Sequence, residues 1–344
     1  MMYKVFEKKE WINSLYQIDE YKIYVPVKQG YYHFFLPLSE GVSPDFSFFN
    51  TRLSPKSIIF PQSERMFEFS LSLDDPEAFI LKEAKKEFPL QAIVGIRPCD
   101  AYAFLIVKRN FDNPDYKDPW WTKRYQNTTF IGLGCNSPRS TCFCTKVGSG
   151  PFAEAGLDVI MYDLGDRFLA KILSDKGEAF LKKIRGGSKA HPEDIEQAEK
   201  LKHKAESKIK ADICLEELLN KRILQVFEAP IWDEISFPCI NCGICTYVCP
   251  TCWCFDIQDE VYKGKGDRIR NWDSCMFPIF TLHASGHNPR AEKFRRVRQR
   301  FMHKLKYYPE RYKDGVQCSG CGRCIMVCPT NMDIRGIANK MANI

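Results

Sequence analysis

The sequence contains two similar cysteine runs, CINCGICTYVCP at residues 239–250 and CSGCGRCIMVCP at residues 318–329. Both have the spacing C-x2-C-x2-C-x3-C-P. Three thiols at positions i, i+3 and i+6 converge on one site only if the backbone wraps around it. Gly243 and Gly322 lie between the second and third cysteine, where a residue without a Cβ permits a tight path. The proline after the fourth cysteine keeps the loop from continuing into a long helix.

This spacing is typical of bacterial ferredoxins with two [4Fe–4S] clusters, in which the fourth cysteine of each run binds the other cluster. The rule predicts two ligand sets, which are Cys239, Cys242, Cys245 and Cys328, and Cys318, Cys321, Cys324 and Cys249. Zinc sites usually take paired C-x2-C units, so a third and a fourth cysteine at this spacing favour clusters. Disulfides are disfavoured because the N-terminus, MMYKVFEKKEW, lacks the apolar stretch of a secretory signal, which predicts a reducing cytoplasmic location.

The composition supports a metal protein of at least two cores. The chain has 344 residues, sixteen cysteines and a formal net charge of +7. Each oxidised cluster with four thiolates carries about two negative charges, so a protein with two or three clusters would be nearly neutral. The positive charge therefore does not predict a nucleic-acid partner. No stretch approaches the length and apolar composition of a membrane span.

A further cysteine group is predicted in the first half of the chain. Residues 90–96 and 129–133 are apolar runs of the buried-strand type, and they lead into RPCD at 97–100 and GC at 134–135. The segment TCFC follows at 141–144. Ligands in α/β sheets gather at the carboxyl ends of strands. We therefore expect a third [4Fe–4S] cluster bound by Cys99, Cys135, Cys142 and Cys144, with zinc or buried free thiols as the alternatives.

The predicted fold class is α+β, in three parts. Residues 1–185 form a mixed α/β domain that carries the cysteine site, 186–235 form a charged helical linker, and 236–344 form a ferredoxin-like dicluster domain with a long insertion. In the first part we expect strands at 22–27 and 31–36, joined as a hairpin, and at 57–60 and 66–70. The glycine-rich loop at 147–156 lacks both the dinucleotide fingerprint and a Walker lysine, so we expect it to pack against the cysteine site.

The insertion between the two runs contains further candidate ligands. Cys252, Cys254 and Cys275 belong to neither run, and His283 and His287 follow them. Three cysteines are too few for an all-cysteine cubane unless a histidine joins them. We therefore expect them to line the two main clusters as contacts that tune the potential, with a fourth metal site as the alternative. The basic segment at 290–313 is interpreted as neutralising the clusters or docking an acidic partner, since no nucleic-acid recognition motif accompanies it.

Several motifs together are more specific than the ferredoxin spacing alone. They are RPCDA at 97–101, GLGC and CFC at 132–144, the GSGP loop, CPTCWC at 249–254, WDSCM at 272–276, GHNPR at 286–290 and the final CSGCGRCIMVCP. With these motifs, nearly the whole chain resembles the iron–sulfur β subunits of soluble cytoplasmic sulfhydrogenases and the A subunits of anaerobic sulfite reductases, which form one family.

The resemblance implies an electron-transfer subunit of an anaerobic oxidoreductase complex. In that family the subunit passes electrons between a flavoprotein that uses NAD(P)H and a separate catalytic subunit of the hydrogenase or sulfite reductase type. The residues agree, because no nucleophile–base pair, Walker loop or nucleotide fingerprint is present. The alternative is a catalytic chain that reduces a substrate at its N-terminal cluster, as a heterodisulfide reductase subunit does. That subunit carries an adjacent Cys-Cys-Gly, whereas no two cysteines are adjacent here.

Overall fold

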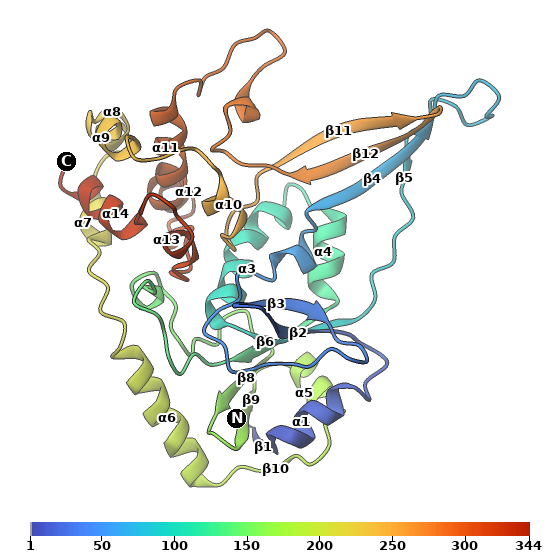
Figure 1. Ribbon diagram of the computed structural model, residues 1–344, viewed down its shortest axis with the longest axis vertical. Coiled ribbons are helices and arrows are strands. Elements are labelled where there is room, and N and C mark those ends of the chain that lie inside the picture. Colours follow the sequence, from blue (N-terminus) through green and yellow to red (C-terminus); the bar gives the residue numbers. More distant parts are fainter. Residues whose placement is uncertain (1) are drawn as a thin grey trace.

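The computed structural model describes residues 2–344 and has a mixed α/β body below a helical C-terminal part (Figure 1). Two sheets are present, and the larger has the strand order β10-β1-β9-β8-β7-β6-β2-β3. Its strands are β1 (Tyr3–Glu7), β2 (Lys22–Gln29), β3 (Tyr32–Pro37), β6 (Gln91–Ile96), β7 (Thr128–Leu133), β8 (Val159–Asp163), β9 (Arg167–Ile172) and β10 (Ser188–Lys189). The smaller sheet, ordered β11-β12-β4-β5, consists of β4 (Ser63–Ser70), β5 (Lys82–Glu83), β11 (Phe255–Tyr262) and β12 (Lys265–Trp272).

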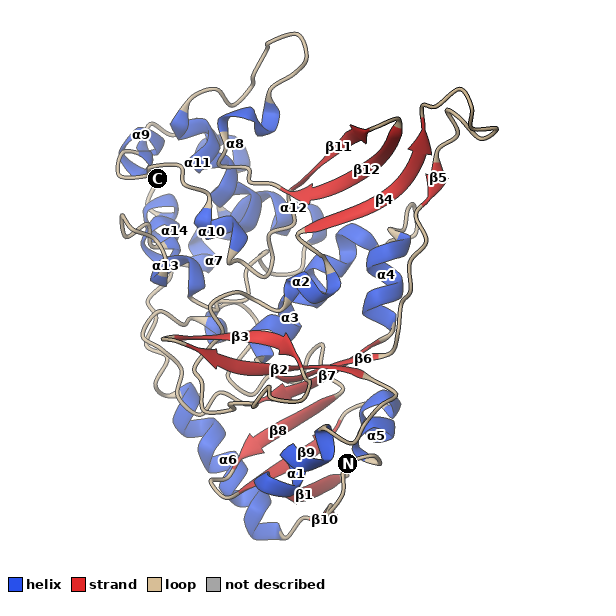
Figure 2. Cartoon of the chain, turned by 45° about the vertical axis from the view of Figure 1, so that its right-hand side comes forward, coloured by secondary structure: helices blue, strands red, loops and turns tan. Residues whose placement is uncertain are grey.

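The helices cover both faces of the large sheet and build most of the C-terminal part (Figure 2). In the first half they are α1 (Lys8–Leu15), α2 (Lys56–Ile59), α3 (Pro98–Phe111), α4 (Pro119–Gln126), α5 (Asp175–Leu181) and the short 3-10 turn η1 (Cys144–Lys146). In the second half they are α6 (Pro192–Glu206), α7 (Leu215–Asn220), α8 (Ile223–Glu228), α9 (Ile231–Ser236), α10 (Ile244–Tyr247), η2 (Pro278–Thr281), α11 (Lys293–Met302), the π-helical turn η3 (His303–Tyr307), α12 (Tyr308–Tyr312), α13 (Arg323–Met326) and α14 (Ile334–Ala342). Of the helices between residues 2 and 344, none combines the length and the apolar composition needed to cross a bilayer.

The centre of the large sheet is parallel, with β2, β6, β7 and β8 side by side. Every residue of β6 and of β7 is buried, as expected for strands covered on both faces. Val94 packs on one face in a core with Trp11 and Phe180, while Ile93 packs on the other face with Phe104 of α3. The predicted strands at 90–96 and 129–133 are therefore confirmed as parallel neighbours, and their carboxyl ends meet at one edge.

The other local predictions concern a hairpin, a short strand and the helical linker. The hairpin at 22–36 is confirmed as the antiparallel pair β2–β3. The strand expected at 57–60 is wrong, because residues 56–59 form the short helix α2. Helices α6 to α9 fall in the segment interpreted as a helical linker, and α6 runs along one side of the molecule towards the C-terminal helices (Figure 1).

The C-terminal helices pack around a core that includes Trp232, Val297, Phe301 and Ile337. Phe143, from the cysteine loop that follows β7, inserts into the same core and is 1% exposed. The N-terminal cysteine loop is therefore part of the packing of the C-terminal part. The smaller sheet makes a second connection, because β12 of the insertion pairs with β4 along its length.

A buried ion-pair network holds the smaller sheet against the large one. Glu64 of β4 accepts hydrogen bonds from Arg270 of β12 (2.5 Å), Arg124 of α4 (2.5 Å) and Lys86 (2.8 Å). The side chains of Glu64 and Arg270 are each 2% exposed. Burial alone would raise the pKa of Glu64, but the hydrogen bond and charge of Arg124, with those of the other cations, lower it from 4.5 to about 2. This carboxylate is therefore ionised at neutral pH.

We expect Glu64→Gln to lower the free energy of unfolding by about 3–5 kcal/mol, because it leaves buried cations without their anion. The measurement is anaerobic urea unfolding followed by tryptophan fluorescence. The pKa of Glu64 is lower in the folded protein than in the unfolded chain. Its contribution to the free energy of unfolding is therefore complete above the ordinary carboxyl pKa, and it is lost as the pH falls towards the folded-state pKa. The loss should therefore be constant between about pH 6 and 8.

Glu68→Gln on the same strand is the matched control, because Glu68 pairs with Arg65 at 3.9 Å on the exposed face. It should change stability by less than about 1 kcal/mol. Equal effects of the two substitutions would contradict the assignment of Glu64 as the centre of the network.

Candidate functional site

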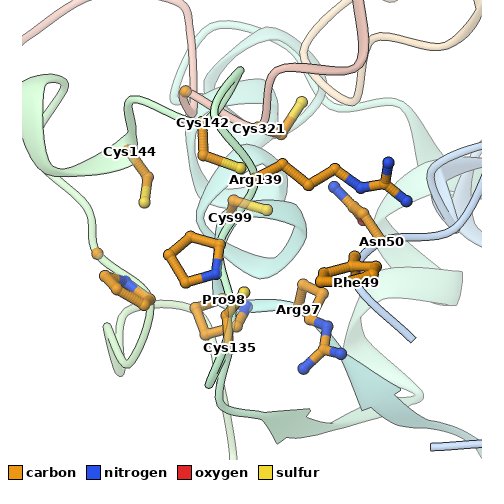
Figure 3. Close-up of a pocket in the computed structure, with 14 residues that line it drawn as sticks. Phe49, Asn50, Arg97, Pro98, Cys99, Cys135, Arg139, Cys142, Cys144 and Cys321 are labelled. Atoms are coloured by element: carbon orange, nitrogen blue, oxygen red, sulfur yellow. The ribbon is translucent and has the colours of Figure 1, made fainter. Parts of the chain in front are cut away.

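The four N-terminal cysteines meet at the carboxyl ends of β6 and β7. Cys99 lies in the first turn of α3, directly after β6, and Cys135 follows β7 by two residues. Cys142 and Cys144 lie in the next loop, and all four thiols line one cavity (Figure 3). The glycine-rich loop contributes Gly150 and Pro151 to the wall, as its expected packing requires. The same cavity is also lined by Cys321, which the sequence assigns to another ligand set.

Two glycines of the second cysteine run let the N-terminal loop approach it closely. Gly320 has φ +66°, and a Cβ there would stand 2.5 Å from the backbone of Cys144. Gly322 has φ +72°, and a Cβ there would meet the carbonyl oxygen of Thr141 at 2.6 Å. The N–H of Phe143 donates to the carbonyl oxygen of Gly320 at 2.9 Å. Only glycine combines this left-handed backbone with so close an approach.

The environment of the N-terminal thiols is apolar and buried. Burial raises the pKa of Cys142 to about 11 and that of Cys144 to about 12. Arg97, which is 5% exposed, lines the cavity and donates its hydrogen bonds to the carbonyl oxygens of Leu133 (3.2 Å), Gly134 (2.6 Å) and Phe48. Isolated thiolates are costly in such a place, whereas thiolates bound to iron are stabilised. The donor set and its surroundings fit an anionic metal cluster.

The first C-terminal set lines a cavity of its own. Cys239, Cys242, Cys245 and Cys328 surround it, although Cys328 comes from the other run. Gly243, at φ +72°, begins the short helix α10 within the first run, and Gly322 begins α13 in the same way within the second. The two runs therefore fold alike. Arg300, which is 4% exposed, also lines this cavity, and its Nε has no hydrogen-bond partner among residues 2–344.

The second C-terminal set is brought together by the packing of the two runs. Burial raises the pKa of Cys318, and the nearby charges of Cys249 and Cys324 act in the same direction. For Cys321, burial is again the largest effect and raises the pKa to about 11, with Cys249 and Cys324 as further contributors. Cys249 and Cys324 therefore lie within electrostatic range of both Cys318 and Cys321, as the predicted crossing of the fourth cysteine requires.

Backbone donors point at the cysteine sulfurs of both runs. The N–H groups of Asn241, Gly320 and Met332 donate to the Sγ atoms of Cys239 (3.4 Å), Cys318 (3.4 Å) and Cys328 (3.2 Å). A threonine hydroxyl also lies near the last thiol of each run, Thr251 at 3.2 Å from Cys249 and Thr330 at 3.5 Å from Cys328. Such hydrogen bonds to the sulfurs are among the features that set cluster potentials.

A buried ion pair that the sequence analysis missed joins two of the thiol sets. Arg323 lies between Cys321 and Cys324, and Asp100 directly follows Cys99. Their side chains are 1% and 0% exposed and form a two-pronged pair, Nη1 to Oδ1 at 2.6 Å and Nη2 to Oδ2 at 2.7 Å. Arg323 also donates to the carbonyl oxygen of Thr51 at 2.9 Å. The only signal in the sequence is one charged residue beside a cysteine in each motif.

The remaining cysteines of the insertion do not line the cavity of the first C-terminal set. Cys252, Cys254 and Cys275 surround a separate cavity instead. His283 and His287 are exposed and lie outside that lining. Among residues 2–344, no three His, Cys, Asp or Glu side chains converge at the spacing suited to a single metal ion.

Comparison with known proteins supports the sequence interpretation. Residues 238–332 match the family model described as a 4Fe-4S dicluster domain. The chain is 28% identical over 332 residues to "Sulfhydrogenase 2 subunit beta" of Pyrococcus furiosus, covering 94% of this chain and 92% of that protein. The expected resemblance to sulfhydrogenase β subunits is thus confirmed. No solved structure matches the chain.

We predict that Cys245→Ser and Cys249→Ser damage different clusters, although the residues lie four apart in the sequence. Cys245 lines the cavity with Cys239, whereas Cys249 lies with Cys318 and Cys321. The measurement is electron paramagnetic resonance (EPR) of the reduced protein, together with its iron content. Loss of the same cluster signal in both variants would show that the assignment is wrong.

We expect Asp100→Asn to lower the free energy of unfolding by about 3–5 kcal/mol, because it leaves the buried guanidinium of Arg323 unpaired. Asp314→Asn is the matched control, since Asp314 pairs with Arg109 between the same two parts of the chain but on the surface. The control should change stability by less than about 1 kcal/mol. Anaerobic unfolding in urea measures both, and similar losses would contradict a special role for the buried pair.

Proposed function

We propose that this chain is the electron-transfer iron–sulfur subunit of a multi-subunit oxidoreductase. In this proposal it relays electrons between a flavin- and NAD(P)H-linked reductase subunit and a separate catalytic subunit of the hydrogenase or sulfite reductase type. The dicluster domain and the sulfhydrogenase relative support the electron-transfer role. The observation that carries the proposal is the contiguous order of three thiol sets.

Each set adjoins the next. Cys321 belongs to the second C-terminal set and also lines the cavity of the N-terminal set. At the other side, Cys249 and Cys324 of the second set lie within electrostatic range of Cys245 in the first set. These contacts support a relay in which the second set is the middle member.

The residues around the thiols serve electron transfer rather than substrate chemistry. When bound, [4Fe–4S] clusters supply one-electron steps at potentials set by charge, hydrogen bonds and exposure. The chain contributes the backbone donors to the sulfurs and buries Arg97 and Arg300 beside the thiols. These fixed positive charges favour the more negative, reduced form of an adjacent cluster.

One end of the thiol series reaches the surface and offers a docking region. Cys242 is exposed, unlike the other ligands of the two runs. Phe237 and Ile240 beside it are 83% and 63% exposed. Phe277 lies against Gly243, and Ile279, two residues further on, is 71% exposed. Exposed apolar side chains next to a cluster suit a contact with a partner subunit.

A second candidate function is reduction of a substrate at the N-terminal cluster. A cavity of about 230 Å³ adjoins that site and shares Arg97 and Cys135 with it. The Oδ1 of Asn136, whose residue lines this cavity, and the Nε of Arg97 have no hydrogen-bond partner among residues 2–344. The volume of this cavity and its unpartnered polar atoms suit a small polar ligand.

We predict that the isolated chain with its full iron content is reduced by dithionite but turns over no small substrate. It should show no hydrogenase, sulfite-reducing or disulfide-reducing activity with artificial donors, because no catalytic group accompanies the clusters. Activity should return when the partner chains are added.

Turnover by the isolated chain that Cys99→Ser abolishes would overturn the relay proposal. It would instead make the N-terminal site an active site. Cys214→Ala is the matched control, since Cys214 caps α7 and lies outside the cavities described here.

A further inference from the structure

Three cysteines outside the predicted ligand sets lie around one cavity. Cys252 and Cys254 follow the first cysteine run, and Cys275 follows β12. The N–H of Asp273 donates to the carbonyl oxygen of Cys254 at 2.9 Å and holds the two segments together. The cavity measures about 280 Å³. Cys254 is among the groups that raise the pKa of both Cys252 and Cys275, so the three thiols are close neighbours.

A histidine that the sequence analysis did not consider lines the same cavity. His303 begins the π-helical turn η3, directly after α11. Such turns occur mostly as isolated features and often at functional sites. A neutral imidazole is a common metal ligand. The cavity therefore offers three thiols and one imidazole, which is enough for four-fold ligation.

Buried cations surround these thiols. Lys56, Lys304 and Arg300 are 6%, 3% and 4% exposed. Lys56 donates to the carbonyl oxygens of Thr246 (3.3 Å) and Cys252 (3.0 Å). Lys304 donates to the hydroxyl of Thr251 (2.8 Å) and the carbonyl oxygen of Gln317 (3.2 Å). Buried cations need a nearby anion.

The groups beside these cations that can become anionic, by binding metal, are cysteine thiols rather than carboxylates. Burial lowers the pKa of Lys56, and the nearby Cys252, Cys249 and Cys254 act in the opposite direction. Cys252 is also among the groups that raise the pKa of Lys304 and of Arg300. Within the described chain, Arg300 has a parallel in Arg97, which lies beside the N-terminal thiols and donates its hydrogen bonds to carbonyl oxygens rather than to a carboxylate. The pattern of a buried cation beside a thiol set is thus repeated at the insertion.

We propose that Cys252, Cys254 and Cys275 bind a fourth iron–sulfur cluster, with His303 as its fourth ligand. The sequence alone favoured these cysteines as mere lining of the main clusters. The separate cavity, the added histidine and the buried cations change that interpretation. A zinc ion with three cysteines and one histidine is the nearest alternative. The cavity is larger than one ion needs, and its ligands do not converge at the spacing of a single-ion site.

The test is metal analysis of the full chain reconstituted anaerobically with iron and sulfide. Cys275→Ser should lower the content by about four irons and about four sulfides per chain relative to the wild type. Cys214→Ala is the matched control, because Cys214 is the one cysteine outside all four proposed sets. The control should retain all the iron. Full iron content in Cys275→Ser, or stoichiometric zinc in the wild-type protein as isolated, would overturn the proposal.

A second measurement addresses the histidine and does not depend on the stability of the cysteine variants. Pulsed EPR of the reduced wild type should show a strong 14N coupling from a directly bound imidazole. His303→Cys should keep the iron content and lose that coupling. If the Cys275→Ser substitution also disturbs a neighbouring cluster, the variant loses more than four irons. In that case the 14N coupling in the wild type would still support the site. Absence of the coupling in the wild type would exclude His303 as a ligand.

Discussion

The buried pair between Arg323 and Asp100 is the interaction on which the arrangement of the thiol sets depends. Each partner is adjacent in sequence to a predicted cluster ligand, so the pair fixes the distance between two ligand loops. Removing two charges from water is costly, and only a two-pronged geometry with further hydrogen bonds offsets it. Arg323 has both, because it also binds the carbonyl oxygen of Thr51. The second cysteine run also approaches the loop at 141–144 closely, at Gly320 and Gly322.

Charge explains why so many cations are buried in this chain. The basic segment at 290–313 is interpreted from the sequence as neutralising the clusters or docking an acidic partner. Its residues Arg296, Arg300, Lys304 and Lys306 are each no more than 5% exposed. Two of them, Arg300 and Lys304, face thiols. Such residues are destabilising in a protein without its anions. Insertion of the clusters should therefore be coupled to folding, as in other metal proteins whose sites do not exist in the unfolded chain.

The sequence predicted those features that depend on local patterns. Cysteine spacing and position predicted three ligand sets, two of which line cavities of their own, and continuous apolar runs correctly predicted β6 and β7. The failures involve contacts between distant residues. Nothing local distinguishes Lys56–Ile59 from a short strand, and its helical form depends on packing. The pairing of β4 with β12 joins residues some 200 positions apart, as at Glu64 and Arg270. His303 was overlooked because it lies far from the cysteines in the sequence and no spacing rule connects them.

The insertion between the two cysteine runs explains how a ferredoxin-like unit becomes a fixed part of a larger protein. It supplies β12, which pairs with β4, and Arg270, which binds the buried Glu64. It also supplies α11, whose Arg300 lies between two thiol cavities. A free ferredoxin carries electrons by diffusing between partners, whereas here the dicluster unit is held against a third thiol site by a shared core, an ion pair and a sheet. In the proposed relay, such anchoring keeps the clusters within range of one another without a new encounter for each electron.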